Sequence, residues 1–125
     1  MSDDGPDIVI VDRPIAPAVL RRLVERYFED MVTFVVDVEQ GIAAVGGELH
    51  ADEEVALLER GCRLENLWGA NYYPGRGEEA CLEYTSLINI RPAQGNRSME
   101  IQDAVVRGRV REIAGALIGR GEPLA

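Results

Sequence analysis

The sequence predicts an α+β domain in which a mixed, largely antiparallel five-stranded sheet carries helices mainly on one face. Stretches rich in β-branched residues alternate with stretches of helical periodicity in the order β-α-β-β-α-β-β-α, and glycine or proline stands near most of the junctions. The length of 125 residues suits one domain with one core. We therefore expect a single domain over residues 1–125, with mobile ends at about residues 1–6 and 120–125.

The first half of the chain predicts a strand, a helix and a hairpin. Residues 7–11, DIVIV, are apolar, rich in β-branched residues and bounded by prolines, which is typical of a strand. Pro17 suits a first helical turn, and apolar residues then recur at helical spacing as far as Met31. Two β-branched runs follow on either side of Gly41, so we expect the second and third strands to form a hairpin there.

The stretch ADEEVALLERG predicts a short second helix. Asp52 is placed to act as its N-cap, and the acids of the first turn complement the helix dipole. Val55 and Leu58 are expected to face inward, and Gly61 suits the C-terminal end.

Two strands and a helix are expected in the remainder. The stretches NLWGANYY and EACLEYTSLINI read as the fourth and fifth strands, joined through residues 74–77, which contain Pro74, Gly75 and Gly77. Residues 103–118 carry apolar side chains at helical spacing, and glycines follow them. The residues predicted to form the core are Leu23, Phe28, Val36, Val45, Ile88, Val110 and Ile113.

Charge and composition exclude several kinds of partner and chemistry. The net charge of −9 opposes binding to nucleic acid or to an anionic membrane, and no apolar run approaches the roughly 20 residues that span a bilayer. Lysine is absent, which excludes a Schiff-base lysine and a phosphate-loop lysine. The acidic start of the chain lacks an apolar signal segment, so a cytoplasmic location is expected, and Cys62 and Cys81 are interpreted as idle thiols.

Several stretches together resemble a known family. They are DMV with VVDVE, then GGELHADEE, LWGANYYP and INIRPAQGNRS. In this combination the chain resembles, over nearly its whole length, an uncharacterised prokaryotic family described only as a domain of unknown function. The resemblance implies a shared fold and marks these segments, but it supplies no activity, so function has to be argued from the site.

The stretch GGELHADEE contains the only histidine and offers candidates for acid/base chemistry. Glu48, His50 and Asp52 are the residues that would carry it. A metal site completed by Asp37 or Glu39 is an alternative, but no motif with ligand spacing such as HExxH is present, so we expect no metal and no cofactor. The simplest alternative is structural, with the acids serving the start of a helix.

The stretch INIRPAQGNRS predicts a loop that binds an anion. Its side chains supply many hydrogen-bond donors, and two arginines can hold a carboxylate or phosphate through paired hydrogen bonds. The alternative is that the arginines pair with acids of the chain itself. The residues expected to bind a ligand are Arg91, Gln94, Asn96, Arg97 and Ser98, together with Asn71, which lies among aromatic residues that either line a pocket or complete the core.

Three functions remain open from the sequence. The first, which we prefer, is binding of an anionic small molecule or peptide group through the Arg/Asn loop. The second is a small enzyme, acid/base or metal-assisted, that uses Glu48, His50 and Asp52. The third is an interaction protein that forms a homodimer or another homo-oligomer. Whether the chain is an enzyme is left open, and we expect the two marked segments to meet in one cleft.

Overall fold

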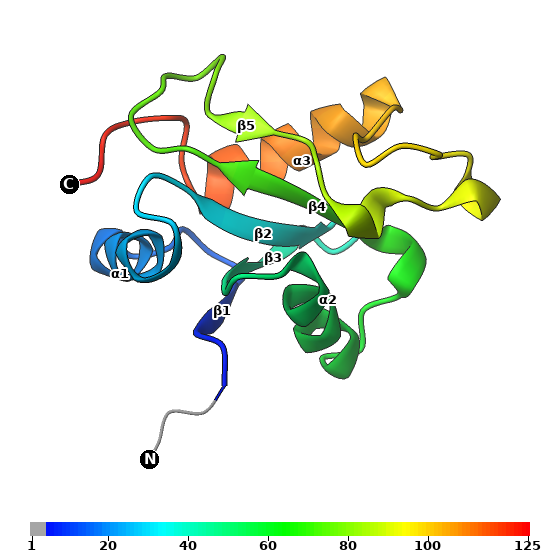
Figure 1. The fold of residues 1–125 in the computed structure, drawn as a ribbon, viewed down its shortest axis with the longest axis horizontal. Helices are drawn as coiled ribbons and strands as arrows, with labels where there is room; N and C mark the ends of the chain where they lie inside the picture. Colours follow the sequence, from blue (N-terminus) through cyan, green and yellow to red (C-terminus); the bar gives the residue numbers. More distant parts are fainter. Residues whose placement is uncertain (1–4) are drawn as a thin grey trace.

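The computed structural model describes residues 5–125, and its five strands form one antiparallel sheet of order β1-β3-β2-β4-β5 (Figure 1). The strands are β1 (Ile8–Val11), β2 (Val32–Asp37), β3 (Ile42–Gly46), β4 (Leu67–Tyr72) and β5 (Leu82–Glu83). The helices are α1 (Pro17–Tyr27), α2 (His50–Glu59) and α3 (Ala104–Leu117), with short 3-10 helices η1 (Leu64–Asn66), η2 (Leu87–Asn89) and η3 (Pro92–Gln94). The α+β prediction and its order of elements are confirmed, and every strand pairing is antiparallel.

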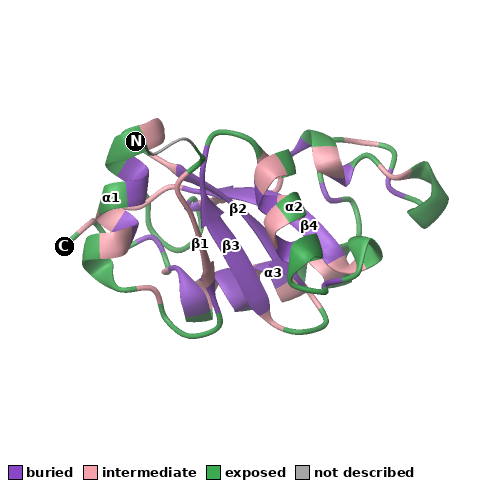
Figure 2. Ribbon diagram, turned by 90° about the horizontal axis from the view of Figure 1, so that it is seen from below, coloured by how far each residue is buried: buried purple, intermediate pink, exposed green. Residues whose placement is uncertain are grey.

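The sheet has apolar side chains on both faces because its central strands are covered on both sides. Strands β2, β3 and β4 are buried along their full length (Figure 2). Helices α1 and α3 pack on the face that carries Phe34 and Val36, whereas Leu57 of α2 packs on the opposite face with Val35. Two of the three helices therefore share one face, and below we call the other one the α2 face.

Most of the predicted core is buried. Phe28 and Ile88 are the exceptions, and both are half-buried. The predicted core residues that are buried are Leu23, Val36, Val45, Val110 and Ile113. In the described part of the chain no helix is long and apolar enough to cross a membrane.

Helix α1 ends before the predicted Met31. Its last residue is Tyr27, and the backbone N–H groups of Phe28 and Glu29 both donate to the Val24 carbonyl oxygen. Glu29 has a φ of 72°, in the left-handed region, which turns the chain out of the helix. Apolar periodicity continues past this point, so it does not reveal the end of the helix.

Helix α2 differs from its prediction in its start and in its buried side. The N-cap is Leu49, which makes no side-chain capping bond, and Asp52 lies in the first turn, so the predicted capping role of Asp52 is wrong. Val55 and Leu58 are 49% and 38% exposed, whereas Glu53 and Leu57 face the sheet with no exposed surface. The predicted inward side is therefore wrong, because a buried acid takes the place of an apolar residue.

The predicted fifth strand is interrupted after two residues. Strand β5 covers only Leu82–Glu83, Thr85 forms a single bridge with Glu100, and the chain then turns through η2. Ser86 accepts a hydrogen bond from the Ile88 N–H at 3.3 Å, as an N-cap does. A local side-chain contact therefore ends the alternating pattern that predicts a strand through Ile90.

The chain after α3 lies against the loop that joins β4 and β5. The Gly121 N–H donates to the Tyr72 hydroxyl at 2.9 Å, and the Gly121 carbonyl oxygen accepts from the N–H groups of Gly75 and Gly77. A Cβ atom at Gly121 would lie 2.3 Å from the Gly77 carbonyl oxygen, so this approach requires glycine. The predicted mobility of both chain ends stays a prediction, and residues 1–4 of the N-terminal end lie outside the described residues.

Candidate functional site

Three segments far apart in the sequence meet on the α2 face of the sheet. His50 is the first residue of α2, Gly69 lies in β4, and Ser86 precedes η2. A Cβ atom at Gly69 would lie 2.8 Å from the Ser86 Cβ and 3.1 Å from the His50 Cδ2. The absence of a side chain at Gly69 therefore lets the imidazole and Ser86 lie directly on the sheet.

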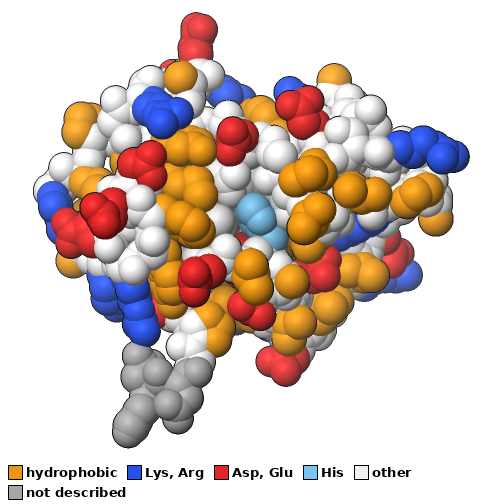
Figure 3. All heavy atoms as spheres, in the orientation of Figure 1, with side chains coloured by type: hydrophobic (Ala, Val, Ile, Leu, Met, Phe, Trp, Pro, Cys, Tyr) orange, Lys and Arg blue, Asp and Glu red, His pale blue; other side chains and the backbone are white. Residues whose placement is uncertain are grey.

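The His50 imidazole is half-buried, and its Nε2 is fixed by a hydrogen bond to the backbone of β4. Its Nε2 lies 2.9 Å from the Ala70 carbonyl oxygen. Because a carbonyl oxygen only accepts, Nε2 carries the hydrogen, and Nδ1 of the neutral ring keeps its lone pair. Burial lowers the pKa of His50 below its ordinary value of 6.5, although the contacts with Ala70 and Asn71 oppose this. The ring reaches the surface near the middle of the view in Figure 3, with apolar side chains on either side.

Asn71 places an unused acceptor beside this ring. Its side chain is 8% exposed, and its Nδ2 donates to a carboxylate oxygen of Glu83 at 2.8 Å. The Tyr73 hydroxyl donates to the same Glu83 oxygen at 3.1 Å. The Asn71 Oδ1 is buried and has no hydrogen-bond partner among the described residues. Since such atoms are rare in folded proteins, this one marks a place for a hydrogen-bond donor.

Glu53 is a second buried polar group on this face. Its carboxyl has no exposed surface, and Oε2 lies 3.0 Å from the Thr33 hydroxyl. Burial raises the pKa of Glu53 well above its ordinary value of 4.5, so the carboxyl is held neutral far more readily than an exposed one. Its Oε1, like the Asn71 Oδ1, lacks a partner among the described residues. Thr33 and Asn71 are paired across β2 and β4, which brings the two unpartnered acceptors to the same part of the sheet.

The acids predicted to act with His50 make no hydrogen bond with its ring in the described structure. Glu48 and Asp52 line a surface hollow of about 420 Å³ together with Arg26 and Tyr27, and the imidazole does not line it. Within residues 5–125, no three side chains of the His, Cys, Asp or Glu type gather as a metal-ligand set. The described structure therefore shows no contact that joins these acids to the imidazole, whereas Asn71 lies beside it.

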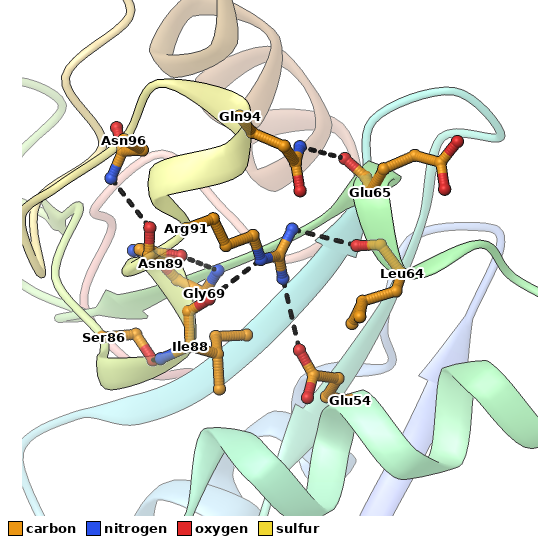
Figure 4. A network of polar contacts seen from close by, with 10 residues as sticks. All are labelled: Glu54, Leu64, Glu65, Gly69, Ser86, Ile88, Asn89, Arg91, Gln94 and Asn96. Atoms are coloured by element: carbon orange, nitrogen blue, oxygen red, sulfur yellow. Dashed lines mark hydrogen bonds and ion pairs between the residues drawn. The ribbon is translucent and has the colours of Figure 1, made fainter.

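Arg91, the first residue of the predicted anion-binding loop, binds its own chain (Figure 4). Its Nε donates to the Ile88 carbonyl oxygen at 3.1 Å and its Nη1 to that of Leu64 at 2.9 Å. Its Nη2 forms an ion pair with Glu54 of α2 at 3.2 Å, and the two side chains are only 10% and 19% exposed. The guanidinium also lies 5.0 Å from the centre of the Trp68 ring. Each nitrogen of the guanidinium is thus bonded within the chain, and the side chain is largely buried.

Asn96 also serves the backbone of its own loop. Its Nδ2 lies within 2.9 Å of the carbonyl oxygens of Asn89, Ser98 and Glu100, and its Oδ1 accepts from the Gln102 N–H at 2.9 Å. The side chain is 3% exposed. Asn96 therefore holds the loop together from inside and offers no free group to a ligand.

The other predicted ligand-binding residues are more exposed. Gln94 donates to the Glu65 carbonyl oxygen at 3.0 Å, and the Ser98 hydroxyl accepts from the Glu100 N–H at 3.0 Å. Arg97 is exposed, and its guanidinium has no hydrogen bond or ion pair with the rest of the described chain. The two marked segments thus meet through Arg91, whose acid partner is Glu54 instead of Glu48 or Asp52. This geometry favours the self-pairing alternative for Arg91.

Comparison with known proteins identifies the family. A family model described as "Protein of unknown function (DUF5674)" matches residues 9–117, which is most of the chain. The chain belongs to this family. No curated protein and no solved structure matches it. The DUF5674 description states no activity, so the site geometry has to carry the functional argument.

The sequence singled out some of the important positions in this DUF5674 domain and missed others. It marked His50 and Asn71, but not Glu53, Thr33 or Ser86. Glu53 follows His50 by three residues, a spacing that places both on one side of a helix, and this is the one signal that could have linked them. Nothing local indicates that this side faces the sheet, because the contact of Glu53 with Thr33 joins residues twenty positions apart.

Proposed function

We propose that this domain binds a small polar ligand over His50, with the imidazole Nδ1 and the Asn71 Oδ1 accepting hydrogen bonds from it. The observation that carries the proposal is the unpartnered Asn71 Oδ1 beside a surface-reaching imidazole whose other nitrogen is already bonded. Both atoms are acceptors, so the matching ligand presents O–H or N–H groups. An alcohol, an amide or an amine has this chemistry.

The charge of the surroundings supports an uncharged or cationic ligand instead of the anion expected from the sequence. Glu83 holds the Asn71 amide, and the chain carries nine more acids than arginines, with no lysine. The loop that was expected to attract an anion uses the guanidinium of Arg91 for contacts within the chain. A negative ligand at His50 would therefore meet repulsion from the net negative charge of the chain.

Acid–base catalysis at the same place is the second candidate function. Burial lowers the pKa of His50, which favours the unprotonated ring that a general base requires near neutral pH. In such a reaction Nδ1 would take a proton from the bound hydroxyl or amine, while the Ala70 carbonyl would keep the ring oriented. Ser86 is not the nucleophile of this scheme, because its hydroxyl oxygen accepts a hydrogen bond from the Ile88 N–H and makes none with His50 in the described structure.

The single histidine gives a direct test. The ring ¹⁵N signals of His50 are unambiguous, and we expect Nε2 to carry the hydrogen and the pKa to lie below 6.5. Titration with small alcohols and amines should shift the Nδ1 signal, whereas acetate and phosphate should not. In a His50→Gln variant, binding of the same probes, followed at the Asn71 side-chain amide, should be lost, and an Arg97→Gln variant should retain it. If anions shift the Nδ1 signal, and this shift is lost in the Arg97→Gln variant, the ligand is an anion that binds at the Arg/Asn loop, and the proposal for His50 is wrong.

The place of action and the source are proposals as well. Cys62 and Cys81 are both buried free thiols, which supports a reducing compartment such as the cytoplasm. Prokaryotic origin rests on the family resemblance alone. Fractionation of the host cells tests the first proposal, since recovery of the protein outside the cytoplasm would contradict it.

Self-association is the remaining alternative from the sequence. Exposed apolar side chains are common in interfaces between subunits, and this chain has three of them on α2 and η2, namely Val55, Leu58 and Leu87. The mass of the protein in solution decides this point. A monomer at all accessible concentrations would exclude a stable homodimer.

A further inference from the structure

Most of the arginines in this acidic chain are neutralised by its own carboxylates. Of the 13 arginines, nine have an aspartate or glutamate oxygen within ion-pair distance in the described structure. A guanidinium without such a partner is available to an external anion. The four exceptions within the described residues are Arg60, Arg97, Arg111 and Arg120.

Two of these four arginines line the same hollow. Arg111 of α3 and Arg120, just beyond the end of α3, border a space of about 290 Å³ between α3 and the chain around β5. Cys81 and Leu82 form its apolar side. The volume is near the lower end of the range that small ligands occupy in proteins.

Glycines on α3 help to keep this space open. Gly108 and Gly115 both line the hollow, so the helix presents backbone there in place of side chains. A Cβ atom at Gly108 would meet nothing within 4 Å, and one at Gly115 would lie 3.4 Å from the Arg120 Nε. The Arg120 side chain therefore lies across the helix at Gly115.

Neither arginine has a carboxylate within ion-pair distance in the described structure. Arg111 donates to the Tyr84 hydroxyl at 3.4 Å and to the Glu78 backbone carbonyl oxygen, and both acceptors are uncharged. The side chain of Arg120 makes no hydrogen bond or ion pair within the described residues. Glu112 also lines the hollow, but its carboxylate is held by Arg109 at 2.7 Å. Glu78 also lines the hollow, and the Glu122 carboxylate lies near it, since it accepts a hydrogen bond from the Arg120 backbone N–H at 2.8 Å. Neither acid forms an ion pair in the described structure, so the two guanidinium groups line the hollow without a direct carboxylate partner.

We infer that this hollow binds a small oxyanion, a carboxylate or a phosphate group, between the guanidinium groups of Arg111 and Arg120. Planar guanidinium groups bind both anions through paired hydrogen bonds, and an apolar part of the ligand would lie against Leu82. The site belongs to the α3 side of the sheet, whereas His50 lies on the α2 face. The inference is therefore independent of the function proposed for His50.

Thermal unfolding of the intact chain tests the inference with inorganic phosphate and with succinate, against sodium chloride at equal ionic strength. A ligand that binds only the folded state raises the Tm in proportion to the logarithm of its concentration well above Kd. We expect such a rise with at least one of the two oxyanions, and which of them acts distinguishes a phosphate site from a carboxylate site. Equal Tm values in both oxyanions and in chloride would overturn the inference.

Matched variants separate the hollow from general charge effects. Arg111→Gln and Arg120→Gln should each weaken binding by about ten-fold or more, as expected for loss of a charge-assisted hydrogen bond. Arg60→Gln and Arg97→Gln remove the same charge from arginines that are also unpaired but lie outside the hollow, so they should leave binding unchanged. Equal weakening by all four variants would show screening of net charge and contradict the site.

A variant that fills the hollow without changing its charge distinguishes loss of the binding site from loss of the fold. Gly108→Leu keeps a helical residue at a position with open space around it, and it should abolish binding while the chain still unfolds cooperatively. Retained oxyanion binding in folded Gly108→Leu would place the ligand elsewhere and overturn the inference. This arm does not depend on Arg111, whose contacts with Tyr84 and Glu78 contribute to folding.

Discussion

The Asn89 side chain pairs with Gly69 as a neighbouring β-strand would. Its Oδ1 accepts from the Gly69 N–H and its Nδ2 donates to the Gly69 carbonyl oxygen, both at 2.9 Å. The same Nδ2 reaches the Met99 carbonyl oxygen at 3.0 Å. Strand β5 ends at Glu83, so the Asn89 carboxamide satisfies the edge of β4 beyond the last residue that β5 covers.

Replacement of this carboxamide by a carboxylate should be strongly destabilising. Asn89→Asp keeps the size and one acceptor, but it turns an oxygen toward the carbonyl oxygens of Gly69 and Met99 and buries a charge. We expect a loss of roughly 3 kcal/mol in the free energy of unfolding, measured by urea denaturation. Asn66→Asp, at a half-buried site whose side chain makes no hydrogen bond in the described structure, is the control and should change stability little. Equal effects of the two substitutions would contradict the role given to Asn89.

The buried Glu53 should make stability depend on pH. Because its pKa in the folded chain is raised above 4.5, the folded state binds more protons than the unfolded state between the two pKa values. Stability from this group is therefore present below the unfolded pKa and is lost as pH rises through the folded pKa. Glu53→Gln should remove that loss, so its stability advantage over the parent chain should grow as pH rises.

Denaturation curves over a pH series check this prediction. Glu59→Gln, which changes an exposed acid on the same helix, should leave the pH profile of the parent chain in place. If Glu53→Gln and the parent chain show parallel profiles, Glu53 does not titrate differently in the folded state.

Arg91 should stabilise the fold more than any exposed arginine. Arg91→Met keeps the apolar stem but leaves the Leu64 and Ile88 carbonyl oxygens and the Glu54 carboxylate without their donor. We expect a loss of roughly 3 kcal/mol, since one member of a largely buried ion pair is removed. Arg97→Met, on the exposed side of the same loop, should change stability by less than about 0.5 kcal/mol.

A double variant distinguishes the ion pair from the backbone contacts. Adding Glu54→Gln to Arg91→Met removes the stranded carboxylate and should recover part of the lost stability. Strictly additive losses would mean that Glu54 and Arg91 do not interact.

Two glycines should respond to alanine in opposite directions. At Gly69 the new Cβ would overlap Ser86 and press on His50, so Gly69→Ala should cost roughly 1–3 kcal/mol and shift the ring signals of His50. At Gly108, within α3 and with open space around it, Gly108→Ala should instead stabilise by roughly 0.5–1 kcal/mol, because alanine favours the helix. Unchanged His50 signals in a folded Gly69→Ala variant would show that the imidazole does not pack against Gly69.

The sequence by itself determined the class of the fold and the centres of most elements. Runs such as VTFVVD and the apolar spacing around Leu23 and Val110 are local signals, and the structure confirms the sheet and the three helices that they predict. The same signals failed where a polar side chain replaces a backbone partner. Ser86 and Asn89 end the fifth strand, although its alternating pattern continues to Ile90.

Only the tertiary structure decided which side of α2 faces the sheet and which residues form the site. Glu53 is buried because Thr33 of β2 gives it a hydrogen bond, and His50 is oriented because the Ala70 carbonyl of β4 lies within reach. The arginine of the predicted loop is occupied because Glu54 and two backbone carbonyl oxygens surround it. The physical reason is that burial of a polar group depends on partners distant in the chain. Apolar periodicity and turn chemistry, in contrast, depend only on a few neighbouring residues.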